Sequence, residues 1–447
     1  MFDLIVIGAG PGGYEAAAHA GHLGKSVAIV EQADLGGTCL NVGCIPAKTF
    51  LRSSRLFREC REAAAFGILV ESPGFDLPAL VARKDHVVGT LTRGVAALLR
   101  STGVEVLAGT GRLVDRNTVE VGGERHEATN ILIATGARPA VPPIPGIDGE
   151  RVLDSTAVFA ITAVPERIAI IGGGYIGLEF ASFFHEIGTE VTVYEALPRI
   201  ATGCDGDVAE ELLKILRHAG IGIHLSCVVQ GIEGDSVRYR DAEGAEHLAA
   251  ATYIVNATGR TPVLSGLGLE EVGIDATARG IPVDDQGRTN VPNVWACGDV
   301  TGQHMLAHVA ARAGIVAVNT MCGRRDRMRF DAIPAVIYSH PEVAMVGKTE
   351  EELQAGAIPY RKAIVPMAVA GRFLVEHENE TGLVKVLVGE PHGEILGVHA
   401  IGDLSSEFIV AAATMIEAEM TLAQAGEIIF PHPTVAEALH AAILKAQ

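Results

Sequence analysis

The chain contains a gapless internal repeat, and this constrains its fold more than any other feature of the sequence. Residues 4–31 and 168–195 each begin with a short apolar run, followed by a G-x-G-x-x-G turn and a helix-length segment. Each copy then ends in a second apolar run that closes on a glutamate. Short continuous apolar runs are typical of parallel strands that are buried on both faces. The repeat therefore predicts two α/β units of the same kind.

The glycines of each turn have separate physical tasks. The first allows a tight turn, the second lets the backbone approach a pyrophosphate, and the third lets helix and strand pack closely. The closing glutamate can accept hydrogen bonds from a ribose 2′-hydroxyl. One such turn is weak evidence, but every part occurs twice here, which predicts two dinucleotide sites. The matching residues are Gly8 and Gly172, Gly10 and Gly174, Gly13 and Gly177, and Glu31 and Glu195.

The second site is predicted to take NAD. A carboxylate at Glu195 would repel the additional phosphate of NADP. Arg199 lies four residues further on and could soften this preference, or it could be a solvated surface charge.

Length and composition narrow the class of protein. The 447 residues exceed one ordinary core, so several domains are expected, and 48% hydrophobic residues exclude a disordered chain. The net charge of −19 argues against binding to nucleic acid phosphates. No apolar run is long enough to span a membrane, and the N-terminal sequence does not look like a signal peptide. We therefore expect a cytoplasmic protein that binds neither nucleic acid nor membranes.

Two cysteines follow the first repeat in the segment GGTCLNVGCIPAK. Cys39 and Cys44 have a C-x4-C spacing, and the nearby glycines would allow an exposed, reducible disulfide. A zinc site would need two further ligands, and two unrelated core thiols remain an alternative. Lys48 lies about one helical turn after Cys44, where its charge would favour a thiolate, unless it is a surface lysine.

Other segments contain candidate polar groups. FPHPTVAEAL (430–439) holds His432 and Glu437, and an imidazole whose second nitrogen bonds a carboxylate is a suitable proton acceptor. Taken alone, His432 between two prolines is more easily explained as structural. Asp299 in WACGDV is placed at a strand end, where it could bond hydroxyl groups or form an ordinary turn. The remaining histidines show no clustering, so no metal ligands are predicted.

Taken together, these motifs resemble the class I pyridine nucleotide–disulfide oxidoreductases along nearly the whole chain. The segments that carry the resemblance are GAGPGG, GGTCLNVGCIPAK, the second repeat, ACGDV with MLAH (305–308), YSHPEVAMVGKTEEEL (338–353) and FPHPTVAE. The resemblance implies an α/β fold, with two Rossmann-like dinucleotide-binding domains and an α+β C-terminal dimerisation domain. The expected divisions are an FAD-binding domain (1–145), an NAD-binding domain (146–265), a central domain completing the FAD site (266–331) and an interface domain (332–447).

The resemblance also implies which residues contact the two cofactors. For FAD they would be Gly8, Gly10, Gly12, Gly13, Glu31, Gly37, Thr38, Lys48, Gly111, Thr135, Gly136, Asp299, Met305, Leu306, Ala307 and His308. For NAD they would be Gly172, Gly174, Gly177, Glu179, Glu195, Val229 and Gly259. Glu179 would pair with Lys48 beside the flavin.

The implied activity is oxidation of a protein-bound dihydrolipoyl group to lipoamide, with NAD⁺ as the final acceptor. Cys39 and Cys44 would form the redox-active disulfide, and His432 with Glu437 would act on the disulfide of the partner subunit in a homodimer. Lys48 and Glu179 would complete the catalytic set. The expected partner is the lipoyl-bearing protein of a 2-oxo acid dehydrogenase or glycine cleavage system. The alternative is an NAD(P)H-dependent reductase of another disulfide or small electron acceptor.

Overall fold

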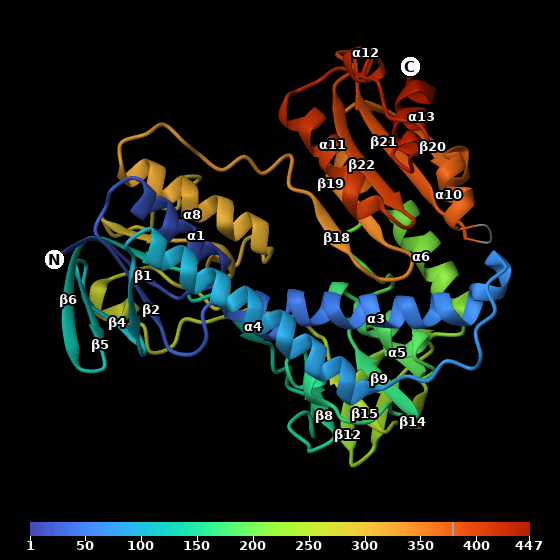
Figure 1. The fold of residues 1–447 in the computed structure, drawn as a ribbon, viewed down its shortest axis with the longest axis horizontal. Coiled ribbons are helices and arrows are strands. Elements are labelled where there is room, and N and C mark those ends of the chain that lie inside the picture. Colours follow the sequence, from blue (N-terminus) through green and yellow to red (C-terminus); the bar gives the residue numbers. More distant parts are fainter. Residues whose placement is uncertain (378–379) are drawn as a thin grey trace.

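The computed structural model describes residues 1–377 and 380–447. Figure 1 shows three groups of strands, with the long helices α3 (Cys44–Glu62) and α4 (Leu77–Ser101) running between them. The N-terminal sheet lies at the left, the second nucleotide-binding unit at the lower right, and the C-terminal sheet at the upper right.

The first repeat forms a parallel sheet against which helix α1 (Pro11–His22) packs. Strand β1 is buried from Leu4 to Ile7, as a parallel strand covered on both faces should be. The parallel strands, in spatial order, are β3 (Glu105–Ala108), β2 (Val27–Glu31), β1 (Phe2–Ile7), β6 (Glu124–Ile133) and β17 (Val294–Ala296). An antiparallel extension from β6 contains β5 (Thr118–Val121) and β4 (Gly111–Asp115).

The second repeat forms a parallel sheet of its own. It carries α5 (Tyr175–Glu186) and α6 (Gly206–Ala219), and an antiparallel sheet of three strands follows along the chain. The parallel strands are β11 (Gly222–His224), β10 (Glu190–Tyr194), β9 (Arg167–Ile171), β15 (Tyr253–Asn256) and β8 (Val152–Asp154). The antiparallel ones are β12 (Val228–Glu233), β13 (Ser236–Arg240) and β14 (Glu246–Ala250).

The glycine-rich turns have the same geometry in both units. A Cβ atom added to Gly13 would lie 1.9 Å from the Gly8 carbonyl oxygen, and one added to Gly177 would lie 2.0 Å from that of Gly172. Gly8 and Gly172 have φ angles of +102° and +113°, which side chains rarely adopt. Gly10 and its counterpart Gly174 face open space. The close packing expected of the third glycine is therefore present twice.

The chain crosses between the two units as a paired ribbon. Strands β7 (Ala137–Pro139) and β16 (Arg260–Pro262) are antiparallel neighbours. After the second crossing, β17 pairs in parallel with β6, so residues from the predicted central domain complete the first sheet. The predicted boundaries at 145, 265 and 331 remain predictions.

Helix α8 (Ala307–Met321) lies against α1 at close range. A Cβ on Gly314 would be 2.4 Å from the Gly12 carbonyl oxygen, and one on Gly12 would meet Ala310. Small residues on both helices therefore permit this approach, which brings residues 305–308 beside the first nucleotide unit. Short helices before α8 are α2 (Gly37–Val42), α7 (Leu269–Val272), and the 3-10 turns Ala63–Phe66, Ala157–Ala160 and Gly298–Thr301.

The C-terminal part is an antiparallel sheet covered by helices, with a core of aliphatic residues such as Val384, Val386 and Val398. Its strands are β18 (Ala335–Ile337), β19 (Val343–Gly347), β22 (Ile395–Ile401), β21 (Leu383–Gly389) and β20 (Tyr360–Pro366). Its helices are α9 (Glu350–Ala355), α10 (Gly371–Glu376), α11 (Ser405–Glu417), α12 (Leu422–Gly426) and α13 (Glu437–Ala446), with a 3-10 turn at Met367–Val369. None of the helices in the described ranges is long and apolar enough to cross a membrane.

Candidate active site

Each nucleotide turn holds its glutamate in the same way. Glu31 accepts hydrogen bonds from the backbone N–H groups of Ala9 and Ala33 at 2.8 and 2.9 Å. Glu195 accepts the equivalent bonds from Gly173 and Leu197 at 2.6 and 2.7 Å. These bonds fix each carboxylate beside its turn, where its remaining lone pairs can accept from a ribose hydroxyl.

The Arg199 guanidinium is bonded to other groups of the chain, which keeps it from pairing with the additional phosphate of NADP. Its guanidinium donates to Glu351 of α9 at 2.8 Å and to the Thr202 carbonyl at 3.3 Å. Because these bonds engage Arg199, the preference of Glu195 for NAD is not offset.

The two candidate redox cysteines lie on either side of a helix break. Cys39 belongs to α2, while Cys44 is the first residue of α3, and Gly43 between the helices is not helical (φ −140°, ψ −107°). This break brings the two thiols into hydrogen-bond contact, which an unbroken helix would not do.

The paired thiols are electrostatically unequal. The hydrogen bond from Cys39 lowers the pKa of Cys44 to about 7, against an opposing effect of burial, and nearby Lys48 lowers it further. The same hydrogen bond and burial raise the pKa of Cys39. The position of Cys44 at the N-terminus of the 19-residue helix α3 also favours a thiolate. Cys44 is therefore the more acidic thiol of the pair, and Cys39 the less acidic.

Lys48 is anchored from two other parts of the chain. Its Nζ lies 2.8 and 2.9 Å from the two carboxylate oxygens of Glu179 on α5, and 4.3 Å from the ring centre of Tyr338. The Tyr338 backbone N–H donates to the same carboxylate at 3.1 Å. The structure thus brings Lys48 and Glu179 together as expected. Tyr338 was quoted only as part of a motif, and nothing in its local sequence indicates a contact with Lys48.

The residues around Asp299 fit a large polar cofactor. Arg260 lies 3.8 Å from Asp299 and donates to Thr38 at 3.4 Å, but its buried Nε has no hydrogen-bond partner among the described residues. Burial raises the pKa of Asp299, although Arg260 opposes this. An unpaired buried donor, a carboxylate and the open space at Gly10 are what the pyrophosphate and ribityl chain of FAD would require. Sequence analysis did not single out Arg260.

The other predicted cofactor residues are distributed as follows. Gly37 packs on Gly10, and Gly111 packs on Ile7, so both allow close backbone approach. Gly136 and Gly259 have φ angles of +69° and +128° at the two crossings, where Thr135 also lies. Met305 and Leu306 precede α8, Ala307 begins it, and His308 Nε2 lies 2.8 Å from the Pro334 carbonyl oxygen. Val229 is on β12.

His432 and Glu437 form the expected pair at the molecular surface. Their Nδ1 and Oε1 atoms are 2.9 Å apart, and the Thr434 backbone N–H also donates to Glu437 at 2.9 Å. The His432 side chain is 78% exposed. A neighbouring groove is lined with exposed apolar side chains, among them Val410 and Ile429. A paired imidazole that points outward beside such a groove is suited to act on a second copy of the chain.

Comparison with known proteins defines the family to which the chain belongs. Residues 2–314 match the family described as pyridine nucleotide-disulphide oxidoreductase, and residues 333–443 match its dimerisation domain. The chain therefore belongs to this family of FAD- and NAD(H)-using disulfide oxidoreductases, and it is an enzyme with a disulfide-based redox centre. The dimerisation domain supports a homodimer.

Within the family, the similar curated proteins are dihydrolipoyl dehydrogenases. Dihydrolipoyl dehydrogenase 3 of Pseudomonas aeruginosa is 41% identical, with 99% of this chain and 97% of that protein covered. Dihydrolipoyl dehydrogenase 1, mitochondrial, of Arabidopsis thaliana is 37% identical, with 99% and 90% covered.

Solved structures agree with this fold. LpdA from Mycobacterium tuberculosis has a TM-score of 0.91 at 28% identity, with 99% of both chains covered. The HOCl-induced flavoprotein disulfide reductase RclA from Escherichia coli has a TM-score of 0.88 at 28% identity, with 100% of both covered.

Alanine substitutions at two glycines of the second turn should separate an effect on stability from an effect on nucleotide binding. Gly177→Ala should lower the free energy of unfolding by about 1–3 kcal/mol or more, because its Cβ would overlap the Gly172 carbonyl. Gly174→Ala should fold normally but bind NADH more weakly, since its Cβ would occupy the space for the pyrophosphate. Denaturant unfolding and NADH titration measure the two effects. Equal stability of the two variants would contradict the steric argument.

The charge of Lys48 should set the titration of Cys44. In the reduced protein, alkylation of Cys44 by iodoacetamide should rise with a midpoint near pH 7, because the pKa of this thiol is lowered to about 7. Lys48→Met should move this midpoint upward by on the order of one pH unit, because the thiolate loses a neighbouring cation. Peptide mass spectrometry identifies the alkylated cysteine. Arg52→Met, at an exposed position on the same helix, is the matched control and should leave the midpoint unchanged.

Proposed function

We propose that the protein is a dihydrolipoyl dehydrogenase that oxidises protein-bound dihydrolipoamide and reduces NAD⁺. The observation that carries this proposal is the unequal thiol pair, Cys39 and Cys44, with Lys48 held beside it. The names of the full-length relatives support the choice of substrate, and the fixed Glu195 carboxylate supports NAD. The lipoyl-bearing protein of a 2-oxo acid dehydrogenase or glycine cleavage system would be its partner, in the cytoplasm.

Thiol exchange follows from the geometry. Starting from the Cys39–Cys44 disulfide, His432 accepts the proton of a dihydrolipoyl thiol, and Glu437 stabilises the imidazolium through Nδ1. The substrate thiolate attacks the Cys39 sulfur, which breaks the Cys39–Cys44 bond and leaves Cys44 as the thiolate. The second substrate thiol then displaces Cys39, so the substrate leaves as a disulfide and the protein holds both electrons as a dithiol.

The low pKa of Cys44 makes it the better leaving group in this exchange. Lys48 stabilises its negative charge, while Glu179 and Tyr338 keep Lys48 in place. Cys39, with its raised pKa, is the poorer leaving group, and the imidazolium of His432 from a second subunit can return a proton to it when the second substrate thiol displaces it. When bound, FAD supplies the two-electron transfer that links this dithiol to the nicotinamide.

We assign the cofactor contacts as the sequence predicts them. FAD would lie on the turn at Gly8, Gly10 and Gly13, with Glu31 and Asp299 on its hydroxyl groups, and NAD would lie on the turn at Gly172, Gly174 and Gly177. The four predicted domains, 1–145, 146–265, 266–331 and 332–447, are proposed as the corresponding units. The pairing of β17 with β6 supports assigning residues 266–331 to the FAD unit.

A reductase of another disulfide or small acceptor is the second candidate. It is favoured by the likeness to RclA, whose title describes a flavoprotein disulfide reductase. Turnover should be measured with lipoamide and with oxidised glutathione, each with NADH and with NADPH. Our proposal expects fast turnover with lipoamide and NADH, and fast turnover with glutathione and NADPH alone would overturn it.

Mixed dimers test whether His432 acts across the subunit interface. Cys44→Ser and His432→Gln should each be nearly inactive as pure proteins. In a mixed dimer, one site combines the intact cysteines of one chain with the intact His432 of the other. Random exchange of equal amounts should therefore restore about one quarter of the wild-type rate, because half the dimers are mixed and each has one intact site. No recovery in dimers shown to be mixed would mean that His432 acts within its own subunit.

A further inference from the structure

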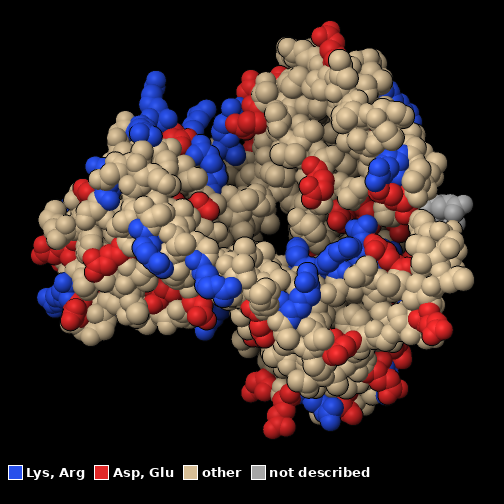
Figure 2. Space-filling model, in the orientation of Figure 1, with Lys and Arg blue, Asp and Glu red and all other residues tan. Residues whose placement is uncertain are grey.

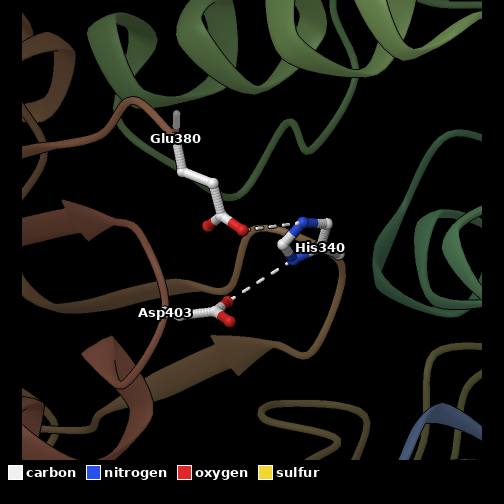
Figure 3. A group of neighbouring side chains, drawn as sticks. All are labelled: His340, Glu380 and Asp403. Carbon is white, nitrogen blue, oxygen red and sulfur yellow. Dashed lines mark ion pairs between the residues drawn. The ribbon is translucent and has the colours of Figure 1, made fainter. Parts of the chain in front are cut away.

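A buried polar cluster outside the active site joins the C-terminal domain to the helices beneath it. Figure 3 shows the Glu380 and Asp403 carboxylates approaching the two nitrogens of His340 from different sides. Nε2 lies 3.4 Å from Glu380 Oε1, and Nδ1 lies 3.6 Å from Asp403 Oδ1. The three side chains come from the β18–β19 loop, the residues before β21 and the residues after β22. One ligand atom of each lies within 4.8 Å of the others.

A second histidine closes the cluster and has an unused ring nitrogen. His377 is only 7% exposed, and its Nε2 has no hydrogen-bond partner among the described residues. That nitrogen faces Asp403 Oδ2 at 3.9 Å, while its Nδ1 lies 3.3 Å from Glu380 Oε2. Glu380 Oε2 is also buried without a hydrogen-bond partner there, whereas Asp403 Oδ2 lies 2.9 Å from Arg55 Nη2. Buried polar atoms without partners are uncommon in proteins, so these point to a ligand.

The separations on the Glu380 side of the cluster match those of atoms that share one small cation, whereas the histidine contacts with Asp403, at 3.6 and 3.9 Å, are longer. Tetrahedral zinc has bonds of about 2.0–2.2 Å to imidazole nitrogen and carboxylate oxygen, which places neighbouring ligand atoms roughly 3.3–3.5 Å apart. The contacts of His340 and His377 with Glu380 are 3.4 and 3.3 Å. Two imidazoles and two carboxylates form a donor set of the kind that zinc accepts.

The charged side chains around the cluster carry a net negative charge, which favours binding of a divalent cation. Arg55 pairs with Asp403 at 2.9 Å, and Arg58 lies 3.3 Å from Glu380 and 3.2 Å from Glu186. Figure 2 shows acidic and basic side chains gathered between the C-terminal domain and the helices below it. The Glu342 carboxylate interacts with Asp403 and Arg55, and Glu59 lies 2.9 Å from Arg55. With these two, five carboxylates face two guanidinium groups, and a divalent cation would reduce the excess of negative charge.

We propose that His340, Glu380 and Asp403, with His377 as a fourth ligand, bind a divalent transition cation of the zinc type. His340 and Glu380 side chains are each 24% exposed, so a cation can reach the site from solvent. Once bound, it would tie three loops of the C-terminal domain together above Arg55 and Arg58 of α3. Because α3 begins at Cys44, the cation would also fix the dimerisation domain relative to the helix that carries the thiolate.

The test uses the FAD-loaded full-length protein carrying Cys39→Ser and Cys44→Ser, because these two neighbouring thiols would themselves bind zinc. After incubation with zinc chloride and gel filtration, elemental analysis should find about one zinc per chain. Adding either His340→Gln or Glu380→Gln should weaken zinc affinity at least about tenfold in calorimetric titration. Glu380→Gln serves as the second variant if His340→Gln does not fold.

The matched control is His432→Gln in the same Cys39→Ser, Cys44→Ser background. It removes the other His–carboxylate pair described above, which is exposed and lies apart from the cluster, and it should leave zinc affinity unchanged. Zinc lost in the control but retained in His340→Gln and Glu380→Gln would overturn the proposal. So would the absence of zinc from the background protein, since the cluster would then be an ion-pair network completed by protons on its histidines.

Discussion

The ion pair between Lys48 and Glu179 is the contact around which the thiol site is organised. It joins α3, which begins at Cys44, to α5, which begins at the second nucleotide turn. Tyr338 adds the C-terminal domain, because its ring contacts the ammonium group and its N–H binds the carboxylate. Three parts of the chain thus hold the Lys48 ammonium group near the Cys44 sulfur. A charge fixed in this way acts on Cys44 without the cost of reorganising a mobile side chain.

The helix break at Gly43 provides the second condition for thiol exchange. It places the two cysteines close together, with Cys44 as the first residue of the 19-residue helix α3. The contact between the thiols lowers the pKa of Cys44 and raises that of Cys39. The exposed His432, held by Glu437, is the complementary part, because it can take the proton of the substrate thiol and later return a proton to Cys39.

Sequence reasoning succeeded where the chemistry is local. The glycine turns, the C-x4-C pair, Lys48 and the His432–Glu437 pair each lie within a few residues of the signal that identified them. It did not single out Arg260 or the contact of Tyr338 with Lys48. The cluster of His340, Glu380 and Asp403 was also missed, since its members are separated by 40 and 23 positions in the chain. No periodicity connects residues that meet only when loops of a folded sheet converge.

The sequence by itself determined the two nucleotide turns and the class of chemistry, because a glycine is required wherever a Cβ would strike a carbonyl one turn away. It also determined that a cation would follow Cys44 by about one helical turn. Only the tertiary structure decided the difference in acidity between the two thiols, the ion pair of Arg199 with Glu351, and the exposure of His432 at the surface. Those properties depend on burial and on charges brought from distant segments, and electrostatic interactions act through space rather than along the chain.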